Sequence, residues 1–308
     1  MRNGRLIFVC LMLLAVSMLG ACSKSVATGS KAENAVASQT EEMIKKETEK
    51  VEAEAEAKAK AEAEEKAKAE AEAQAKKEQE GAGAQVNKVE AIPGQHRDPN
   101  SAIVVIDPGH QLRGDSKKEP NGPGSSTMKA RVTSGTTGVA TRVAEYMMNL
   151  EVSLKLKTEL ENRGYTVYMT RSTHDVNISN KERAEYATNV GADIAVRIHG
   201  NGSTNSSVHG VEAYAPSYNN PYVSHLAKAS QSLSQCIVDA YSAATGFKNR
   251  GVFASDTMTG INWSTVPVTI IELGYMSNAE EDRKMQDEVI QNNMVQGIAN
   301  GIDAYFGF

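Results

Sequence analysis

The feature that most limits how this chain can fold is a 40-residue segment, residues 41–80, built almost entirely from three residue types. It contains 14 Glu, 9 Lys and 11 Ala, and it has no aromatic residue, no Gly and no Pro. Such a composition supplies too little apolar surface to form a hydrophobic core. Of the 308 residues, roughly 230 follow this segment, a size typical of one large α/β domain.

The same segment is expected to act as a spacer. Ala, Glu and Lys favour helices, and Ala alternates with charged residues, so no apolar stripe for a coiled coil forms. Five Glu–Lys pairs lie at i,i+4 in the stabilising order: 54/58, 56/60, 62/66, 64/68 and 72/76. The composition is compatible with a solvated single helix or with a disordered charged linker. Glycines and prolines between residues 81 and 99 then mark a flexible join.

The net charge of −5 is distributed unevenly along the chain. Residues 1–40 carry +3, residues 41–80 carry −5 and residues 81–308 carry −3. Because the globular part is close to neutral and has no basic run, the sequence argues against binding to nucleic acid.

The first 21 residues have the pattern of a targeting segment. Arg2 and Arg5 precede the apolar stretch 6–19, which is shorter than the roughly 20 residues that a permanent membrane-spanning helix needs. The stretch ends in Leu-Gly-Ala-Cys22, which resembles the bacterial lipobox, where cleavage before the Cys leaves that residue lipidated. We therefore expect a lipoprotein signal peptide over 1–21, lipid attachment at Cys22 and a spacer over 22–99. An ordinary signal peptide cleaved nearby is the alternative.

No disulfide is expected in the mature chain. Cys10 is removed with the signal peptide, and Cys236 lies alone among apolar residues of a predicted helix. Packing must therefore stabilise the globular part.

From Ser101 the sequence becomes globular. Short apolar runs predict strands, and amphipathic stretches predict helices. Strands are expected at 103–107, 165–170, 194–198, 211–215 and 268–271, and helices at 143–163, 181–190, 221–244 and 288–305. Asn278 and Glu281 are expected to form a capping box that opens a further helix. This alternation implies an α/β catalytic domain over 100–308, with a mixed, mostly parallel sheet flanked by helices.

Chemically capable side chains follow the ends of these strands. His110 follows the first strand, His199 follows the third, Glu272 follows the run 268–271, and Glu145 lies at the start of the first helix. Loops at the carboxyl ends of strands hold the sites of open α/β sheets. Two His and one Glu match a ligand set of catalytic zinc, which leaves a fourth position for water. Taken singly, each His is more often structural or on the surface, and Glu145 would be a solvated helix residue. Glu272 is harder to explain in this way, because a carboxylate directly after four apolar strand residues needs a partner.

Seven short motifs occur in order over residues 101–308. They are IVVIDPGH (103–110), EYMMNL (145–150), GYTVYMTR (164–171), 183–187 with 192–193, IHGN (198–201), NRGV (249–252) and IELGYMSN (271–278). In this order they resemble the zinc-dependent N-acetylmuramoyl-L-alanine amidases of the amidase type 3 family. The resemblance implies Zn²⁺ as cofactor, His110, Glu145 and His199 as its ligands, and Glu272 as the catalytic acid/base.

The chain also departs from this family. Gln111 stands where Gly is usual, and Arg197 and Gly200 flank His199 where Ser and Ala are usual. Residues 112–141 are longer than the common loop and rich in Gly, Ser, Thr and Pro, and a loop of that length is usually functional or disordered. These differences leave the proposed ligands intact but bear on substrate preference.

Further residues are candidates by position. Asn201, Arg250 and Trp263 are candidate substrate-binding residues. Asn201 and Asp107 either orient the metal site or cap loops. Arg250 either contacts a stem-peptide carboxylate or forms a structural ion pair, and Trp263, the only Trp, either stacks on substrate or packs. His209 is a weaker candidate ligand, with a plain loop histidine as the alternative.

The expected function is a peptidoglycan hydrolase that cleaves the amide bond between N-acetylmuramic acid and L-alanine with zinc-activated water. Glu272 would take the proton of the water and deliver it to the departing amine. The expected partners are peptidoglycan and, through the lipid anchor, the outer face of the cell membrane, whereas no activating protein can be named. The alternatives are a non-catalytic wall-binding lipoprotein and a zinc peptidase acting within the stem peptide.

Overall fold

The computed structural model describes residues 101–308. The predicted signal peptide, the lipid-attachment residue Cys22 and the spacer lie outside the described residues. Within residues 101–308, no helix combines the length and the apolar character that crossing a membrane requires.

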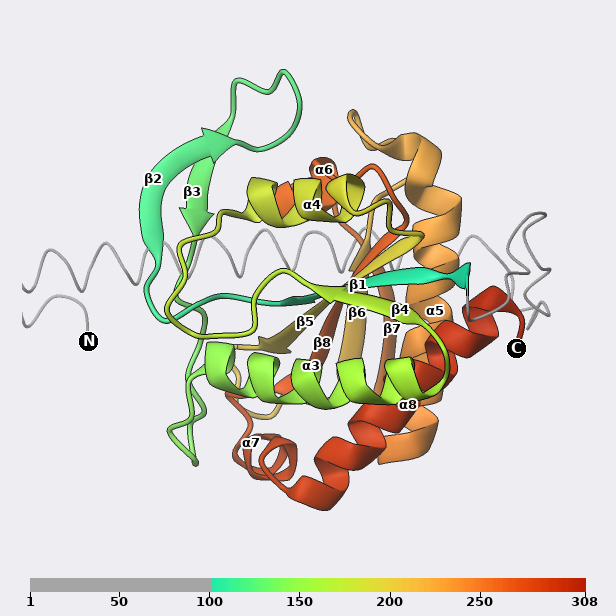
Figure 1. Ribbon diagram of the computed structural model, residues 1–308. Coiled ribbons are helices and arrows are strands. Elements are labelled where there is room, and N and C mark those ends of the chain that lie inside the picture. Colours follow the sequence, from blue (N-terminus) through green and yellow to red (C-terminus); the bar gives the residue numbers. More distant parts are fainter. Residues whose placement is uncertain (1–100) are drawn as a thin grey trace, which may run out of the picture. The chain divides into compact units, whose positions relative to one another are not determined.

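A six-stranded sheet lies at the centre of the described part (Figure 1). Its order is β4 (Thr166–Met169), β1 (Ile103–Pro108), β5 (Ile194–Asn201), β8 (Val268–Tyr275), β6 (Val211–Ala215) and β7 (Asn249–Ala254). All neighbouring strands are parallel except β6 and β8, which are antiparallel. The three strands β1, β5 and β8 are nearly continuous apolar runs because helices cover both faces of the sheet. The predicted mixed, mostly parallel sheet is therefore confirmed.

Helices cover the sheet on both sides. On one side, α3 (Glu145–Asn162), α5 (Ala227–Thr245) and α8 (Glu288–Phe306) share a hydrophobic core with β1 and β5. On the other, α4 (Asn180–Asn189), α6 (Thr259–Asn262) and the turn η2 (Ser224–Leu226) contribute to a second, smaller core. In Figure 1, α3 and α8 lie below the sheet, and α4 and α6 lie above it. The short helix α7 (Ala279–Met285) links β8 to α8.

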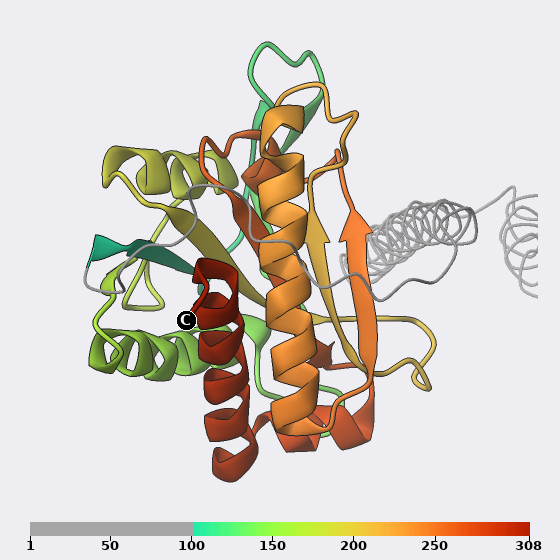
Figure 2. The same ribbon diagram turned by 90° about the vertical axis from the view of Figure 1, so that its right-hand side faces the viewer.

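The helices α5 and α8 lie side by side, as Figure 2 shows. Gly297 and Gly301 of α8 face the backbone of α5, and a Cβ at Gly297 would come 2.6 Å from the Cα of Tyr241. Only glycine therefore permits this close approach, and it brings the buried side chains of both helices into one core.

The segment expected as a long loop, 112–141, instead contains a β-hairpin that projects at the upper left of Figure 1. Its antiparallel strands are β2 (Asp115–Pro120) and β3 (Met128–Val132). Contacts with α4 and α6 hold it: the indole N–H of Trp263 donates to the carbonyl of Pro120 at 2.9 Å, and the backbone N–H of Lys181 donates to Glu119 at 3.1 Å. We refer to residues 115–132 as the hairpin.

Other boundaries also differ from the predictions. The strand β8 continues to Tyr275 and β5 continues to Asn201, so Glu272 and His199 lie inside these strands and do not follow their ends. Asn278 caps α7 as predicted, accepting from the N–H groups of Glu280 and Glu281. The Glu281 side chain does not complete the capping box, because it accepts from the backbone of Tyr275 and Gly210 instead.

Candidate metal centre

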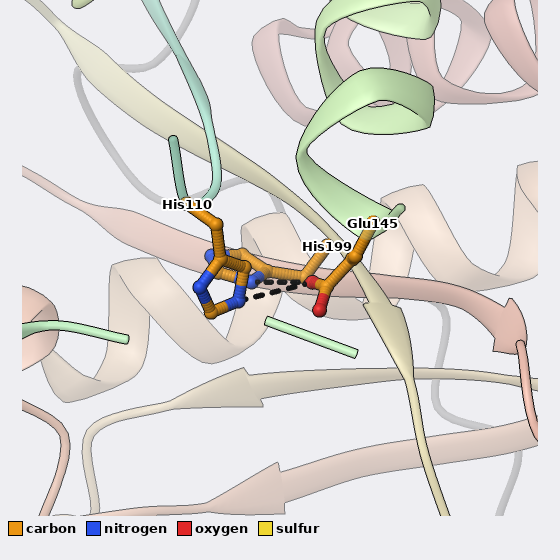
Figure 3. A group of neighbouring side chains, drawn as sticks. All are labelled: His110, Glu145 and His199. Carbon is orange, nitrogen blue, oxygen red and sulfur yellow. Dashed lines mark hydrogen bonds and ion pairs between the residues drawn. The ribbon is translucent and has the colours of Figure 1, made fainter. Parts of the chain in front are cut away.

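Three of the predicted side chains come together at one edge of the sheet (Figure 3). The atoms that His110, Glu145 and His199 can offer to a metal ion all lie within 4.8 Å of one another. His110 Nε2 lies 3.1 Å from Glu145 Oε1, and His199 Nδ1 lies 3.2 Å from the same oxygen. A tetrahedral ion with bonds of about 2.0–2.2 Å separates its ligand atoms by about 3.4 Å, so this spacing fits one ion.

The strand register explains why the two histidines meet. Pro108, the last residue of β1, pairs with Ile198 of the parallel strand β5, so His110 just beyond β1 and His199 inside β5 come to the same end of the sheet. Gly109 continues this pairing by donating its N–H to the carbonyl of Ile198 at 2.9 Å. A side chain at Gly109 would collide with the ring of His199, which packs directly on the glycine. His110 itself has a positive φ of 58°, a strained conformation for a residue other than glycine that often accompanies a functional site.

The segment that leads from the hairpin to α3 supports the ligands from above. His110 Nδ1 lies 2.9 Å from the carbonyl of Thr133, which can only accept, so Nδ1 carries a proton and Nε2 is the nitrogen left to bind a metal ion. The N–H of Thr136 donates to Glu145 Oε2 at 2.8 Å. Gly135 lies so close that a Cβ would come 2.6 Å from the same oxygen.

Electrostatics favour a cation at this position. Burial raises the pKa of Glu145, but the charge and the hydrogen bonds of the two histidines outweigh it and hold that pKa well below its usual range. Burial lowers the pKa of His110, but the charge of Glu145 more than offsets this effect, so the pKa of His110 is raised. Burial lowers the pKa of His199 to about 4. His199 Nε2 is buried and has no hydrogen-bond partner among the described residues. A buried carboxylate beside two imidazole rings is a donor set suited to a divalent metal.

A buried cluster of charges fixes the backbone that carries His110. Asp107 accepts from Arg183 Nη1 and from Arg197 Nε, each at 2.7 Å, and all three side chains are buried. Arg183 also donates to the carbonyl of His110 at 3.0 Å, and Arg171 donates to that of Gly109 at 3.0 Å. Asp107 therefore orients this loop through arginines.

Glu272 lies next to this group in the sheet. Its Cα pairs with that of His199 in β5 on one side and with that of Glu212 in β6 on the other. The charge of Glu272 also contributes to the raised pKa of His110, after burial and Glu145. The strand register thus brings the predicted acid/base beside the candidate ligands.

Glu212 was missed from the sequence. It is fully buried and accepts four hydrogen bonds at 2.7–2.8 Å, from Asn201 Nδ2, Arg250 Nε and the hydroxyls of Tyr214 and Tyr275. Two of the predicted substrate residues, Asn201 and Arg250, therefore turn toward this carboxylate. A Glu between the apolar residues Val211 and Ala213 of a strand was the available signal.

Two other candidates lie outside the group of three. His209 is exposed, and its Nδ1 lies 3.0 Å from the carbonyl of Ser207. It is therefore a loop histidine, which was the alternative to a role as metal ligand. Trp263 lies where the hairpin meets α4 and α6, and Lys181 Nζ lies 4.3 Å from the centre of its ring.

Comparison with known proteins identifies the family of the chain. The family model described as N-acetylmuramoyl-L-alanine amidase matches residues 104–304. The amidase LytC of Bacillus subtilis is 27% identical over 203 residues, which cover 66% of this chain and 35% of LytC. The chain thus spans about a third of the length of that relative.

Solved structures show the same fold. The catalytic domain of the amidase CwlV from Bacillus (Paenibacillus) polymyxa var. colistinus is 30% identical, with a TM-score of 0.53, and the match covers 66% of this chain and 97% of that one. The apo form of the amidase Ami1 from Mycobacterium abscessus is 26% identical with a TM-score of 0.60, covering 67% and 98%. Since the family model matches well over half of the sequence, the chain belongs to the N-acetylmuramoyl-L-alanine amidase family.

Proposed function

We propose that this protein is a peptidoglycan hydrolase that cleaves the amide bond between N-acetylmuramic acid and L-alanine. The observation that carries the proposal is the cluster of His110, Glu145 and His199 with Glu272 on the adjacent strand. Membership of the amidase family supports the choice of bond. The names of similar proteins, such as the probable cell wall amidase LytH of Staphylococcus epidermidis, support action at the cell wall.

The metal ion in this proposal is zinc, held by His110, Glu145 and His199. The close spacing of the three donor atoms and the ionised Glu145 support this donor set. When bound, zinc supplies the chemistry that makes a water molecule acidic at neutral pH and polarises an amide carbonyl. The carbonyl of Thr133 and the N–H of Thr136 keep His110 and Glu145 oriented.

Glu272 then acts as the acid/base. Its carboxylate accepts a proton from the attacking water, whose oxygen bonds to the lactyl carbonyl carbon. The same group returns the proton to the nitrogen of L-alanine as the C–N bond breaks, because an amide nitrogen leaves poorly unless it is protonated. The products are a muramic acid carboxylate and a stem peptide with a free amino group.

The remaining predicted residues take supporting roles in this proposal. Asn201 and Arg250, held by Glu212, form a polar wall beside Glu272 that can meet the stem peptide, and Trp263 meets substrate farther out. The enzyme acts outside the cytoplasm, attached to the membrane by a lipid on Cys22 and facing the cell wall, with residues 22–99 as a spacer before the catalytic domain at 100–308.

The test is the product pattern from purified muropeptides incubated with the full chain and Zn²⁺. An amidase releases intact stem peptide and unmodified sugar, which mass spectrometry resolves. Shortened peptides still attached to sugar would instead identify a peptidase acting within the stem. Unchanged muropeptides with retained wall binding would identify a non-catalytic binding protein, and either result would refute the proposal.

A further inference from the structure

A pocket of about 620 Å³ lies on the side of the sheet that α4 and α6 cover, and the tip of the hairpin at Pro123 lines it. Its volume is within the range of about 300–1,000 Å³ that is usual for small-molecule sites. Four separate parts of the chain form its wall: the hairpin tip at Pro123, the end of α4 at Asn189, the residues around Tyr222, and the residues around Trp263. None of the three predicted metal ligands lines it.

Two aromatic side chains form the apolar part of the pocket. Trp263 and Tyr222 are both partly exposed. The indole N–H of Trp263 is engaged with Pro120, and the ring of Tyr222 packs on Gly122, where a Cβ would come 2.8 Å from it. The rings are therefore fixed by the hairpin while part of their surface faces the pocket.

Polar side chains complete the wall. Asn189 and His225 are exposed, line the pocket, and form no side-chain hydrogen bond with any described residue. By contrast, Asn262 is fully buried and its amide is satisfied by Asn220 and by the carbonyl of Asp256. The pocket thus presents uncommitted amide and imidazole groups beside aromatic surface.

The charge of the pocket favours a neutral ligand. Lys181 lies over the Trp263 ring and 3.6 Å from Glu185, so these opposite charges offset one another. No Arg or Lys lines the pocket itself. A phosphate or the carboxylates of a stem peptide would find no cation here, whereas a saccharide pairs its C–H face with an aromatic ring and its hydroxyls with amide and imidazole groups.

The hairpin connects this pocket to the metal centre. Its tip lines the pocket, and its base at Val132 leads directly to Thr133, whose carbonyl contacts His110. The strand β2 spans five residue steps, or about 17 Å at the usual rise per residue. A polymer bound at the metal centre could therefore reach the pocket with sugar units several positions away.

We propose that this pocket is a saccharide subsite that binds the glycan strand of peptidoglycan at a distance from the bond that is cut. Trp263 and Tyr222 contact the sugar ring, and Asn189 and His225 bond to its hydroxyl or acetamido groups. This subsite deepens the proposed function and rests on it for the identity of the polymer.

Intrinsic fluorescence tests the subsite directly, because Trp263 is the only Trp of the chain. The full chain is titrated with the tetramer of β-1,4-linked N-acetylglucosamine, which shares the sugar chemistry of the glycan but carries no stem peptide. We expect a saturable change in Trp emission. Asn189→Ala and His225→Ala should each weaken binding by up to about tenfold, the loss expected for one hydrogen bond or one ring contact.

Tyr168→Ala is the matched control, because Tyr168 is 40% exposed on the edge strand β4 and does not line the pocket. It should bind the tetramer as the unmodified chain does. The subsite is refuted if the tetramer causes no saturable change, or if the Asn189 and His225 variants both bind it with unchanged affinity. It is also refuted if a stem peptide without sugar produces the emission change and the tetramer does not.

Activity separates this proposal from the enzymatic one. The pocket variants should keep the rate on single muropeptides and lose activity several-fold on long glycan strands. If the chain binds the tetramer but cleaves no muropeptide, the amidase proposal fails and the subsite stands. If it cleaves muropeptides and the tetramer does not bind, the subsite fails and the amidase proposal stands.

Discussion

Replacing Asp107 by Asn tests whether buried charge holds the loop that carries His110. Asp107 is 2% exposed and is the shared acceptor of two buried guanidinium groups, Arg183 and Arg197. Asn has nearly the same shape but no charge, and its NH₂ group would face one arginine as a second donor. Breaking a buried ion pair in this way costs about 3–5 kcal/mol because charges remain buried without compensation.

The expected result is a large loss of stability that depends on pH. For a domain of this size, about 3–5 kcal/mol corresponds to a fall in Tm of roughly 6–20 °C at neutral pH. Burial raises the pKa of Asp107, but Arg183 and Arg197 outweigh it and hold that pKa far below its unfolded value. The stabilisation that the charge of Asp107 provides is therefore complete above the unfolded pKa of about 4 and disappears as the pH falls further. Below that pH, the difference in stability between the variant and the unmodified chain should shrink.

Thermal unfolding followed by circular dichroism, at several pH values with Zn²⁺ and with a chelator, measures both effects. The matched control is Asp175→Asn, because Asp175 pairs with Arg113 at 4.0 Å while both side chains are about 80% exposed. An exposed pair contributes little, so this control should unfold with the unmodified chain. If Asp107→Asn behaves like the control at neutral pH, the buried cluster does not hold the loop and the reasoning is wrong.

Three further predictions address the metal, its packing and the anchor. Glu272→Gln should retain zinc while turnover of muropeptides falls by roughly 10²–10⁴-fold. Alanine at any of the three proposed ligands should lower zinc content as well as turnover. Metal analysis beside initial rates distinguishes the two cases, and a zinc-free Glu272→Gln would make Glu272 a ligand. Gly109→Ala should displace the ring of His199, which packs on this glycine, and should weaken zinc affinity, measured by competition with a chelator. In the control Gly124→Ala, the new Cβ meets no atom within 4 Å, so zinc affinity should not change despite the positive φ of Gly124. Equal zinc affinities in the two variants would contradict the packing argument. Cys22→Ser should remove the lipid and release the protein from the membrane fraction or leave uncleaved precursor, and unchanged lipid labelling would exclude the lipobox.

The sheet was predictable where strands are buried on both faces. The runs at β1, β5 and β8 are apolar and β-branched, so each is visible without knowledge of its neighbours. The edge strand β7 and the hairpin strand β2 are mixed or largely polar, because each has a solvent-exposed side. Such strands form through pairing with a partner elsewhere in the chain, and local composition carries little sign of it.

The candidate site divides in the same way. His110 directly follows β1 and His199 lies near the end of β5, two strands that are visible in the sequence, so the sheet topology brings them together. Glu212 could not be assigned a role from the sequence. Three of its four hydrogen-bond partners lie in other strands: Asn201 in β5, Arg250 in β7 and Tyr275 in β8. These residues meet Glu212 only in the folded sheet. Charge networks of this kind depend on register, which a single sequence does not give.

The position of β8 in the strand order has a consequence for the synthesis of the protein. It is the last strand in the sequence, yet it alone joins β4-β1-β5 to β6-β7. A nascent chain that has not yet reached residue 268 can form these two halves but cannot unite them, and it lacks Glu272. Pairing between β5 and β8 also spans some seventy residues, which makes closure of the sheet a late and slow step. Under the proposed mechanism, a chain that ends before residue 272 lacks the acid/base and would carry no hydrolytic activity.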